Sequence, residues 1–385
     1  MAKDKESLNI PFHSPHLNVS TRRLVNEVIK SGWLTTGSKV AAFEDGVKEL
    51  LDLKHALAVS SGTAALHLAY MLLDLKPGDE VIVPSLTFCS TINMIVHIGA
   101  TPVFCDIDEK TLCVDPKDVQ RKITKRTKAV VIVHFAGMPC DISALEKICK
   151  AKRIMLVEDA AHAFLTTYKG KRIGSHGNLT CFSFYATKVI TCAEGGLLSS
   201  GSAEHVAQAR ILSLHGLSRG AWNRYAKDGS LSYQVLMPGY KYNLSDIHAA
   251  IGLSQLADVE KDREERQHFA DVYRELLKDV PEIILPTDPP YSDSTHAWHL
   301  FTIQLRDVRK RDALIAHLKN VGIGTSIHFP PNHLQPYYRK CFGKISLPVT
   351  EKVGKRILSL PIYHTLGTSG VSRVTSAIKD FYNKK

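Results

Sequence analysis

The sequence lacks the signatures of several classes of protein. None of its eight cysteines is spaced as a Cys-x-x-Cys pair, so we expect neither a zinc site nor a redox motif, and no bound metal. No apolar stretch is long and charge-free enough to span a membrane, and residues 1–5 do not resemble a signal peptide. Internal repeats and low-complexity linkers are also missing. These absences predict a protein of the reducing cytoplasm that does not insert into membranes.

The chain is basic, with a net charge of +11 and an isoelectric point near 9.1, but it has no recognisable nucleic-acid-binding module. Its lysines and arginines are scattered, with only short clusters such as residues 122–126. We therefore expect no nucleic acid partner. A basic surface would equally attract an anionic small molecule.

What is present indicates an α/β protein. A chain of 385 residues with 44% hydrophobic content can bury a large core, and its length favours two domains. Short, apolar, β-branched segments at residues 80–84, 101–105, 128–134 and 154–157 are separated by amphipathic segments such as residues 143–150. This alternation predicts βαβ units and a mostly parallel sheet.

The domain boundary is expected near a long helix. Residues 246–266 predict one continuous helix that ends in dense charge, and we place the boundary in or just beyond it. The prediction is an N-terminal arm with a large domain over residues 1–255, followed by a smaller α+β domain over residues 256–385. In the smaller domain, residues 299–305 are expected to form a strand and residues 310–320 a helix.

The segment Ser183-Phe184-Tyr185-Ala186-Thr187-Lys188, followed by Glu194-Gly195-Gly196, places a lysine between an apolar run and a glycine-rich turn. A lysine in that setting can lose solvent, which lowers its pKa and makes the amine a nucleophile that can form an imine. Taken alone, the lysine could equally belong to the solvated surface, as most lysines do.

The acidic pair Glu158-Asp159 follows the apolar run 154–157, which is expected to be a buried strand. Acidic residues at the carboxyl end of a parallel strand point into the crevice where α/β proteins bind ligands. A carboxylate there can keep the pyridinium nitrogen of pyridoxal phosphate protonated. The alternative is that Glu158 or Asp159 caps a following helix.

The segment Ser60-Ser61-Gly62-Thr63-Ala64-Ala65 follows a short strand-like run and opens a helical segment. The exposed N–H groups of a helix N-terminus attract an anion, and the hydroxyls of Ser61 and Thr63 could bind a phosphate. The same residues are common in turns and N-caps. The glycine spacings of a Walker loop and of a dinucleotide fingerprint are absent.

These three segments, with the lysine 29 residues after Asp159, resemble the site of a fold-type I pyridoxal-phosphate (PLP) enzyme. The chain is similar to the DegT-like family of nucleotide-sugar aminotransferases from residues 31–37 to residues 360–361. Within the family it is most similar to the UDP-4-amino-4-deoxy-L-arabinose–oxoglutarate aminotransferase branch, on residues 190–196, 239–243 and 296–301. The resemblance implies an aspartate aminotransferase-like large PLP-binding domain with a mostly parallel, seven-stranded sheet and a smaller C-terminal α+β domain.

The resemblance also assigns roles to single residues. Lys188 would bind the cofactor as an imine and move protons, and Asp159 would pair with the pyridinium nitrogen. His162, where many relatives carry glutamine, would lie near the phenolic oxygen, and Phe88 would stack on the pyridine ring. The remaining matches are Gly62, Thr63 and Ser183 for the cofactor phosphate, Asn243 for the phosphate of the neighbouring subunit, and Leu34, Thr35, Thr36, Gly37, Tyr242 and His328 for the nucleotide sugar.

The implied activity is transfer of an amino group from L-glutamate to a 4-keto nucleotide sugar, with pyridoxamine phosphate as the intermediate form, in a homodimer with shared active sites. The product would be a 4-amino sugar nucleotide for envelope glycan or secondary-metabolite synthesis. The retained Lys188 argues against the family's dehydratases, which carry histidine there. Val189, where relatives often have asparagine, and the variable segment 330–333 leave the nucleotide and the sugar open. A 3-keto sugar aminotransferase and a PLP-binding regulator are the alternatives.

Overall fold

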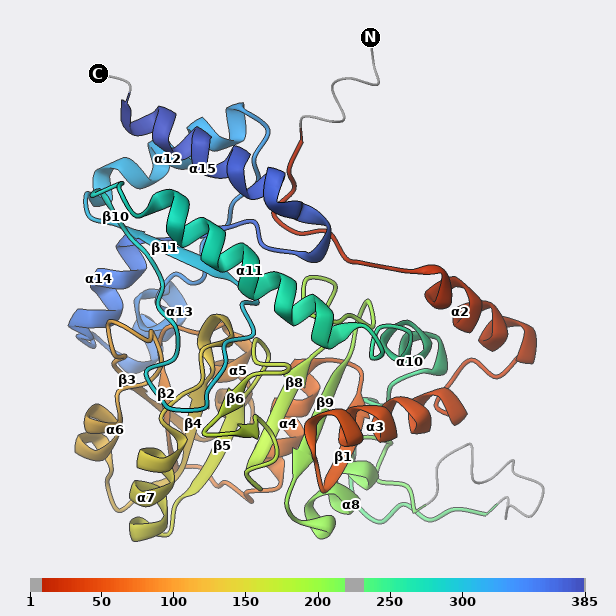
Figure 1. Ribbon diagram of the computed structural model, residues 1–385. Coiled ribbons are helices and arrows are strands. Elements are labelled where there is room, and N and C mark those ends of the chain that lie inside the picture. Colours follow the sequence, from red (N-terminus) through yellow and green to blue (C-terminus); the bar gives the residue numbers. More distant parts are fainter. Residues whose placement is uncertain (1–8, 219–231, 384–385) are drawn as a thin grey trace.

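The computed structural model describes residues 9–218 and 232–383, and its largest element is a seven-stranded sheet (Figure 1). The strand order is β1-β9-β8-β5-β4-β2-β3. Only β9 is antiparallel to its neighbours, while the other pairs run parallel. The mostly parallel sheet predicted from the sequence is therefore confirmed. The strands are β1 His55–Val59, β2 Glu80–Pro84, β3 Thr101–Cys105, β4 Thr127–Val133, β5 Met155–Asp159, β8 Leu179–Ser183 and β9 Gly196–Ser200.

Both faces of this sheet are buried, which explains why its strands are nearly continuous apolar runs. In β4, Val130 and Ile132 belong to one hydrophobic cluster, and Ala129 and Val131 belong to another on the opposite face. The first cluster includes residues of α3 Ser38–Leu51, α6 Pro116–Lys122, α7 Ile142–Lys152 and α10 Asp246–Leu253. The second includes residues of α4 Gly62–Met71, α5 Ser90–His97 and α8 Ala203–Leu212.

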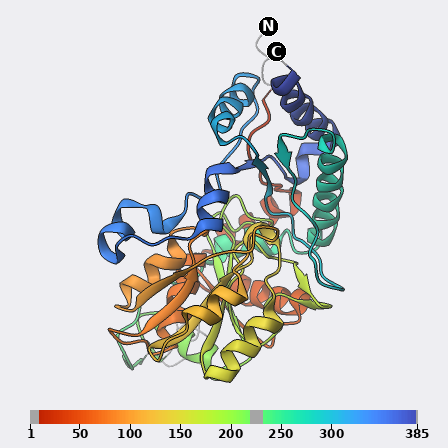
Figure 2. The same ribbon diagram turned by 90° about the vertical axis from the view of Figure 1, so that its left-hand side faces the viewer.

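Most of the C-terminal part forms a layer above the carboxyl ends of the parallel strands, whereas α13 and α14 lie beside the large sheet and add Tyr338 and Val353 to its core clusters (Figures 1 and 2). Its three-stranded antiparallel sheet, in the order β10-β11-β12, shares a third core cluster with α11, α12 and α15. The bounds here are α11 Val259–Leu277, β10 Ile283–Ile284, β11 Phe301–Leu305, η2 Val308–Lys310, α12 Arg311–Asn320, η3 Asn332–Leu334, α13 Pro336–Phe342, α14 Pro348–Arg356, β12 Ile357–Leu360, η4 His364–Leu366 and α15 Gly367–Asn383.

The N-terminal segment connects the two parts. Ile10 forms a parallel bridge with Ile323 in the C-terminal part, and the chain then runs to α2 Val19–Ser31, which packs against α10. The remaining short elements are η1 Phe135–Gly137 and the hairpin of β6 Thr167–Tyr168 and β7 Lys171–Arg172. No helix among the residues that the model describes is long and apolar enough to cross a membrane. Residues 1–5, which do not resemble a signal peptide, lie outside the described part.

The prediction of one continuous helix over residues 246–266 is wrong. The structure has two helices there, because α10 ends at Leu253 and α11 begins at Val259. The hydroxyl of Ser254 and the side-chain amide of Gln255 both donate to the carbonyl of Ile251, at 2.7 Å each. Such local side-chain bonds to the backbone compete with the helix ladder. The domain boundary expected between residues 255 and 256 falls in this turn and stays a prediction.

Candidate active site

A cavity of about 380 Å³ lies at the carboxyl ends of the central parallel strands. This is the position at which open α/β sheets bind ligands. Three elements that are far apart in the sequence supply its walls: the start of α4, the end of β5 and the connection between β8 and β9. The predicted site residues that line it are Gly62, Thr63, Phe88, Asp159, His162, Ser183, Lys188 and His328.

Lys188 lies in the connection between β8 and β9. Phe184 N donates to Gly195 O over 2.8 Å and Cys192 N donates to Phe184 O over 2.9 Å, which closes this connection into a compact loop. The loop places the Lys188 amine in the wall of the cavity. Burial lowers the pKa of Lys188 from 10.5 to about 8, although the nearby carboxylate of Asp159 acts to raise it. A lysine with such a pKa keeps part of its amine neutral near pH 7 and can act as a nucleophile.

This pKa gives a testable pH dependence. Only the neutral amine reacts with an electrophile, so acetylation of Lys188 in the cofactor-free protein should increase with pH and reach half its maximum near pH 8. In Asp159→Asn the midpoint should move to lower pH, because the carboxylate that stabilises the ammonium form is gone. Mass spectrometry of the labelled peptide measures both curves. A midpoint near pH 10.5 in the wild type would show that Lys188 is not desolvated.

Asp159 is the last residue of β5, and its buried side chain faces the same cavity. Its Oδ2 accepts a hydrogen bond from the Thr91 hydroxyl at 2.7 Å, and its Oδ1 accepts one from Ala161 N at 3.1 Å. Burial raises the pKa of this carboxyl, while the two hydrogen bonds act in the opposite direction. No helix follows Asp159 directly, so the alternative that this pair caps a helix is wrong. A buried carboxylate held in this way suits a positively charged ring nitrogen.

Glu158 points away from the cavity, as neighbouring residues in a strand do. It is fully buried, accepts a hydrogen bond from the amide of Asn178 at 2.8 Å and pairs with His134 Nε2 at 2.9 Å. Of the two acidic residues in the motif, only Asp159 therefore lines the cavity.

The start of α4 forms the opposite wall. Ser61 is the N-cap, and its hydroxyl accepts a hydrogen bond from Ala64 N at 3.0 Å, so the N-cap alternative is correct for this residue. Within the described residues, the N–H groups of Gly62 and Thr63 donate to no protein atom. A Cβ on Gly62 would lie 2.9 Å from Ser183 Cβ, so the glycine lets this helix end approach β8 closely. The arrangement fits a phosphate bound by backbone N–H groups and hydroxyls.

Histidines form much of the remaining wall, and two of them, His13 and His299, were not predicted from the sequence. His162 and His299 lie with ring centroids 4.5 Å apart, and His13 and His328 complete the group. Burial lowers the pKa of all four rings, to about 4 for His13 and His328, which makes them neutral at physiological pH.

The contacts of His162 fix its tautomer. Its Nδ1 accepts a hydrogen bond from Ala136 N at 3.2 Å, so its proton is on Nε2. The side chain can therefore donate one hydrogen bond from Nε2, which suits a neighbouring oxygen acceptor.

His299 lies in the segment 296–301, which carried part of the family resemblance, but nothing in its spacing indicated a place in the site. His13 comes from the N-terminal segment, which has no periodic pattern.

The other predicted site residues, which include Asn243 for the cofactor phosphate of the neighbouring subunit, lie outside this cavity. Asn243 donates from its amide to the Thr36 hydroxyl at 2.7 Å, and Gly37 N donates to the Asp246 carboxylate at 2.8 Å. Tyr242 lines a different cavity, where its ring stacks on Tyr240 with centroids 5.1 Å apart. The structure thus brings Thr35, Thr36, Gly37 and Asn243 to the start of α10, apart from Lys188 of the same chain, while Leu34 is 48% exposed.

Comparison with known proteins finds relatives that match almost the whole chain. The model of the DegT/DnrJ/EryC1/StrS aminotransferase family matches residues 15–379. The spore coat polysaccharide biosynthesis protein SpsC of Bacillus subtilis is 44% identical over 377 residues, which cover 96% of each chain. Spr1654 of Streptococcus pneumoniae has been solved in a PLP form and a PMP form, and each is 30% identical to this chain with a TM-score of 0.91. Each match covers 98% of this chain, together with 99% of the PLP-form chain and 100% of the PMP-form chain. The sugar aminotransferase CalS13 of Micromonospora echinospora is 29% identical with a TM-score of 0.87, over 96% of this chain and 99% of that one.

Proposed function

The chain belongs to the DegT/DnrJ/EryC1/StrS aminotransferase family, and on that basis we propose that it transfers the amino group of L-glutamate to a 4-keto nucleotide sugar. The protein is a PLP-dependent sugar aminotransferase. The observation that carries the proposal is the pairing of a desolvated lysine, Lys188, with the buried carboxylate of Asp159 across one cavity. The product would be a 4-amino sugar nucleotide for a polysaccharide, in keeping with the similarity to SpsC.

Each residue of the cavity would have a distinct catalytic or binding role. PLP, when bound, supplies an electron sink for the carbon from which a proton is removed. The amine of Lys188 takes that proton from the donor and returns one to the sugar carbon in the second half-reaction. Asp159 keeps the ring nitrogen protonated. The remaining contacts would be Phe88 against the ring face, Nε2 of His162 near the phenolic oxygen, and Gly62, Thr63 and Ser183 at the phosphate.

The two half-reactions would alternate at this one site, with the amino group carried between them by pyridoxamine phosphate, and this predicts ping-pong kinetics. The basic net charge of +11 favours the approach of an anionic nucleotide sugar. The cytoplasmic location expected from the sequence stays a prediction.

A panel of keto-sugar nucleotides tests the acceptor. The PLP-loaded protein would be incubated with L-glutamate and matched 4-keto and 3-keto sugars on UDP, GDP and dTDP, and the aminated carbon assigned by NMR. We expect the amine at C4. An amine at C3 would establish the alternative reaction, and failure to aminate any keto sugar would contradict the proposed acceptor class.

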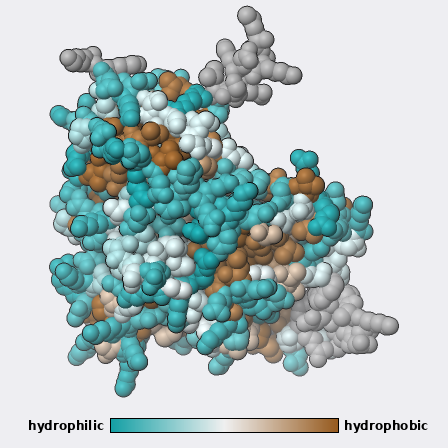
Figure 3. All heavy atoms as spheres, viewed as in Figure 1, coloured by the Kyte–Doolittle hydropathy of each residue, from teal (hydrophilic) through white to brown (hydrophobic). Residues whose placement is uncertain are grey.

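We further propose a homodimer in which Asn243 reaches the cofactor phosphate of the neighbouring subunit. Two features support this. Asn243 lies outside the cavity of its own chain, and apolar surface gathers around α2 and α10 (Figure 3). In or beside α2, Leu17, Val19 and Ile29 are 49%, 82% and 56% exposed, and an exposed apolar patch is typical of a surface that contacts another protein chain.

Mixed dimers give a direct test of shared sites. Lys188→Ala and Asn243→Ala subunits should each be weakly active alone. After co-expression, each mixed dimer contains one site with both wild-type residues, so a random mixture should regain about a quarter of the wild-type activity. Lys188→Ala mixed with Lys188→Ala,Asn243→Ala is the matched control and should regain none. No recovery in the first mixture would contradict the placement of Asn243 in the partner's site.

A further inference from the structure

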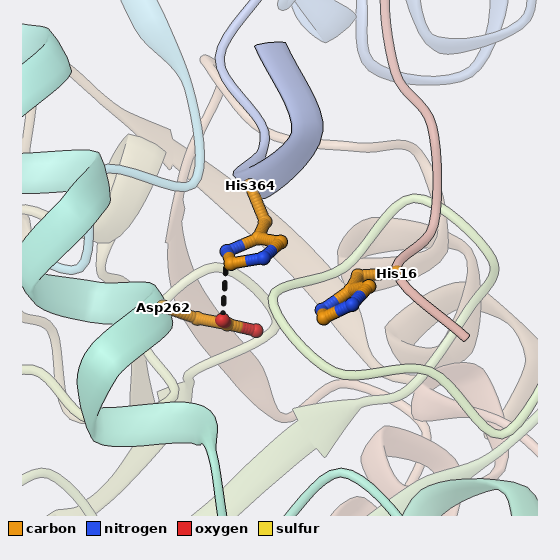
Figure 4. Close-up of side chains that lie close together, drawn as sticks. All are labelled: His16, Asp262 and His364. Atoms are coloured by element: carbon orange, nitrogen blue, oxygen red, sulfur yellow. Dashed lines mark ion pairs between the residues drawn. The ribbon is translucent and has the colours of Figure 1, made fainter. Parts of the chain in front are cut away.

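A second group of polar side chains lies outside the cavity, where three segments of the chain meet (Figure 4). His16 comes from the N-terminal segment, Asp262 from the first turn of α11, and His364 from η4. Glu265, one turn after Asp262, also contacts His364 through an ion pair. The group therefore consists of two imidazoles and two carboxylates that are brought together only by the fold.

The geometry of the group is compact. The rings of His16 and His364 are stacked, with centroids 4.1 Å apart and planes inclined by 17°. The Nδ1 atom of His364 lies 3.0 Å from Oδ1 of Asp262. One potential ligand atom from each of His16, Asp262 and His364 lies within 4.8 Å of the others.

Two atoms at the centre of the group are held close together without a hydrogen bond. The Asp262 side chain is 10% exposed, and its Oδ1 atom and Nδ1 of His364 are both buried; they contact each other as an ion pair, and Nδ1 also pairs with Glu265, but neither atom makes a hydrogen bond. Burial of a polar atom without a hydrogen bond costs about 1–3 kcal/mol, so such atoms usually have a partner. Their separation of 3.0 Å is close to the roughly 3.3 Å between two ligands of a tetrahedral zinc ion.

We propose that His16, Asp262 and His364 bind one divalent transition-metal ion of the Zn²⁺ class, with Glu265 as the fourth ligand. Imidazole nitrogen and carboxylate oxygen are the donors that suit Zn²⁺ and its neighbours in the first transition row. Because a metal ion lies in the plane of each imidazole that binds it, the ring of His16 must rotate out of its stack on His364 and shift by roughly 1–2 Å. It lies in an irregular segment and is only partly buried, so it can do so.

The proposed ion would connect the N-terminal segment to the C-terminal part. His16 follows Phe12 and His13, which line the cavity that contains Lys188. A metal bond at His16 would therefore restrict the segment that forms this part of the cavity wall. The site is structural in this proposal and takes no part in the transfer of the amino group.

Zinc binding to the full-length, untagged, PLP-loaded protein tests the proposal. Equilibrium dialysis against micromolar ZnCl₂, with metal measured by mass spectrometry, should show a site that His16→Ala and His364→Ala each weaken by at least about 100-fold. Glu265→Gln should weaken it less. His268→Ala removes an exposed histidine of the same helix α11 and is the matched control, which should bind like the wild type.

Co²⁺ provides a second readout that responds only to coordination. In the wild type, Co²⁺ should give the visible absorption of a four-coordinate ion, and His16→Ala should lose it. His16→Ala is suited to this purpose because a partly buried residue outside the hydrophobic core clusters should not be needed for folding. Equal zinc binding by the wild type, His16→Ala and His364→Ala would overturn the proposal. So would the absence of micromolar binding, in which case the group is an ion-paired cluster of His364 with Asp262 and Glu265.

Discussion

Replacement of Lys188 by alanine is expected to lower turnover by about 10⁴-fold or more while the protein still binds the cofactor. The reason is that Lys188 is the cavity residue with the lowered pKa of about 8 and therefore the one amine there suited to nucleophilic attack and proton transfer. The contacts proposed for the cofactor phosphate at the start of α4 do not involve this side chain. Steady-state rates with L-glutamate and an accepted keto sugar, together with cofactor titration, measure the two effects separately.

Two controls make this result specific. Lys319→Ala removes an exposed lysine in the last turn of α12 and should leave turnover unchanged. Methylamine added to Lys188→Ala should restore part of the lost rate, because a small amine can occupy the vacated space. Turnover within tenfold of the wild type in Lys188→Ala would contradict the assignment of this residue.

Asp159→Asn is expected to lower turnover by about 10³-fold with little loss of stability. Asparagine has nearly the same shape and can still accept the hydrogen bond from Ala161 N, but it carries no charge and its NH₂ group cannot accept from Thr91. The ring nitrogen of the cofactor would then lose the anion that keeps it protonated. The measurements are kcat for both half-reactions and the thermal unfolding midpoint.

The neighbouring residue is the matched control for Asp159. Glu158 lies on the same strand but points to the other side, where it is buried against His134 and Asn178. Glu158→Gln should therefore lower the free energy of unfolding, by about 3 kcal/mol for a disturbed buried pair, and leave turnover within a few-fold. If the two variants showed the opposite pattern, the assignment of Asp159 as the functional carboxylate would be wrong.

The sequence predicted the large sheet well because its strands are buried on both faces. Such strands are continuous apolar runs, and the segments 80–84 and 101–105 coincide with β2 and β3. The sequence failed at residues 246–266, where helix-forming residues surround a turn. The helix is interrupted because the side chains of Ser254 and Gln255 both donate to the carbonyl of Ile251. A pattern of apolar residues does not show this local competition.

The site was predictable to the extent that its residues occur in ordered motifs next to strands. Lys188, Asp159 and Gly62 lie at the ends or starts of predicted elements, and the structure places all three around one cavity. His13 and His16 could not be found in this way. They belong to a segment without periodic structure, and their neighbours in space, such as His299 and His364, are more than 250 residues away in the sequence.

The most direct test of the account is the absorption spectrum of the PLP-loaded protein before and after addition of L-glutamate alone. We expect a visible band from the cofactor bound to Lys188, which glutamate should replace by the spectrum of pyridoxamine phosphate with stoichiometric release of 2-oxoglutarate. A visible band that persists in glutamate would contradict the proposed donor. The absence of any such band would contradict the role of Lys188 itself.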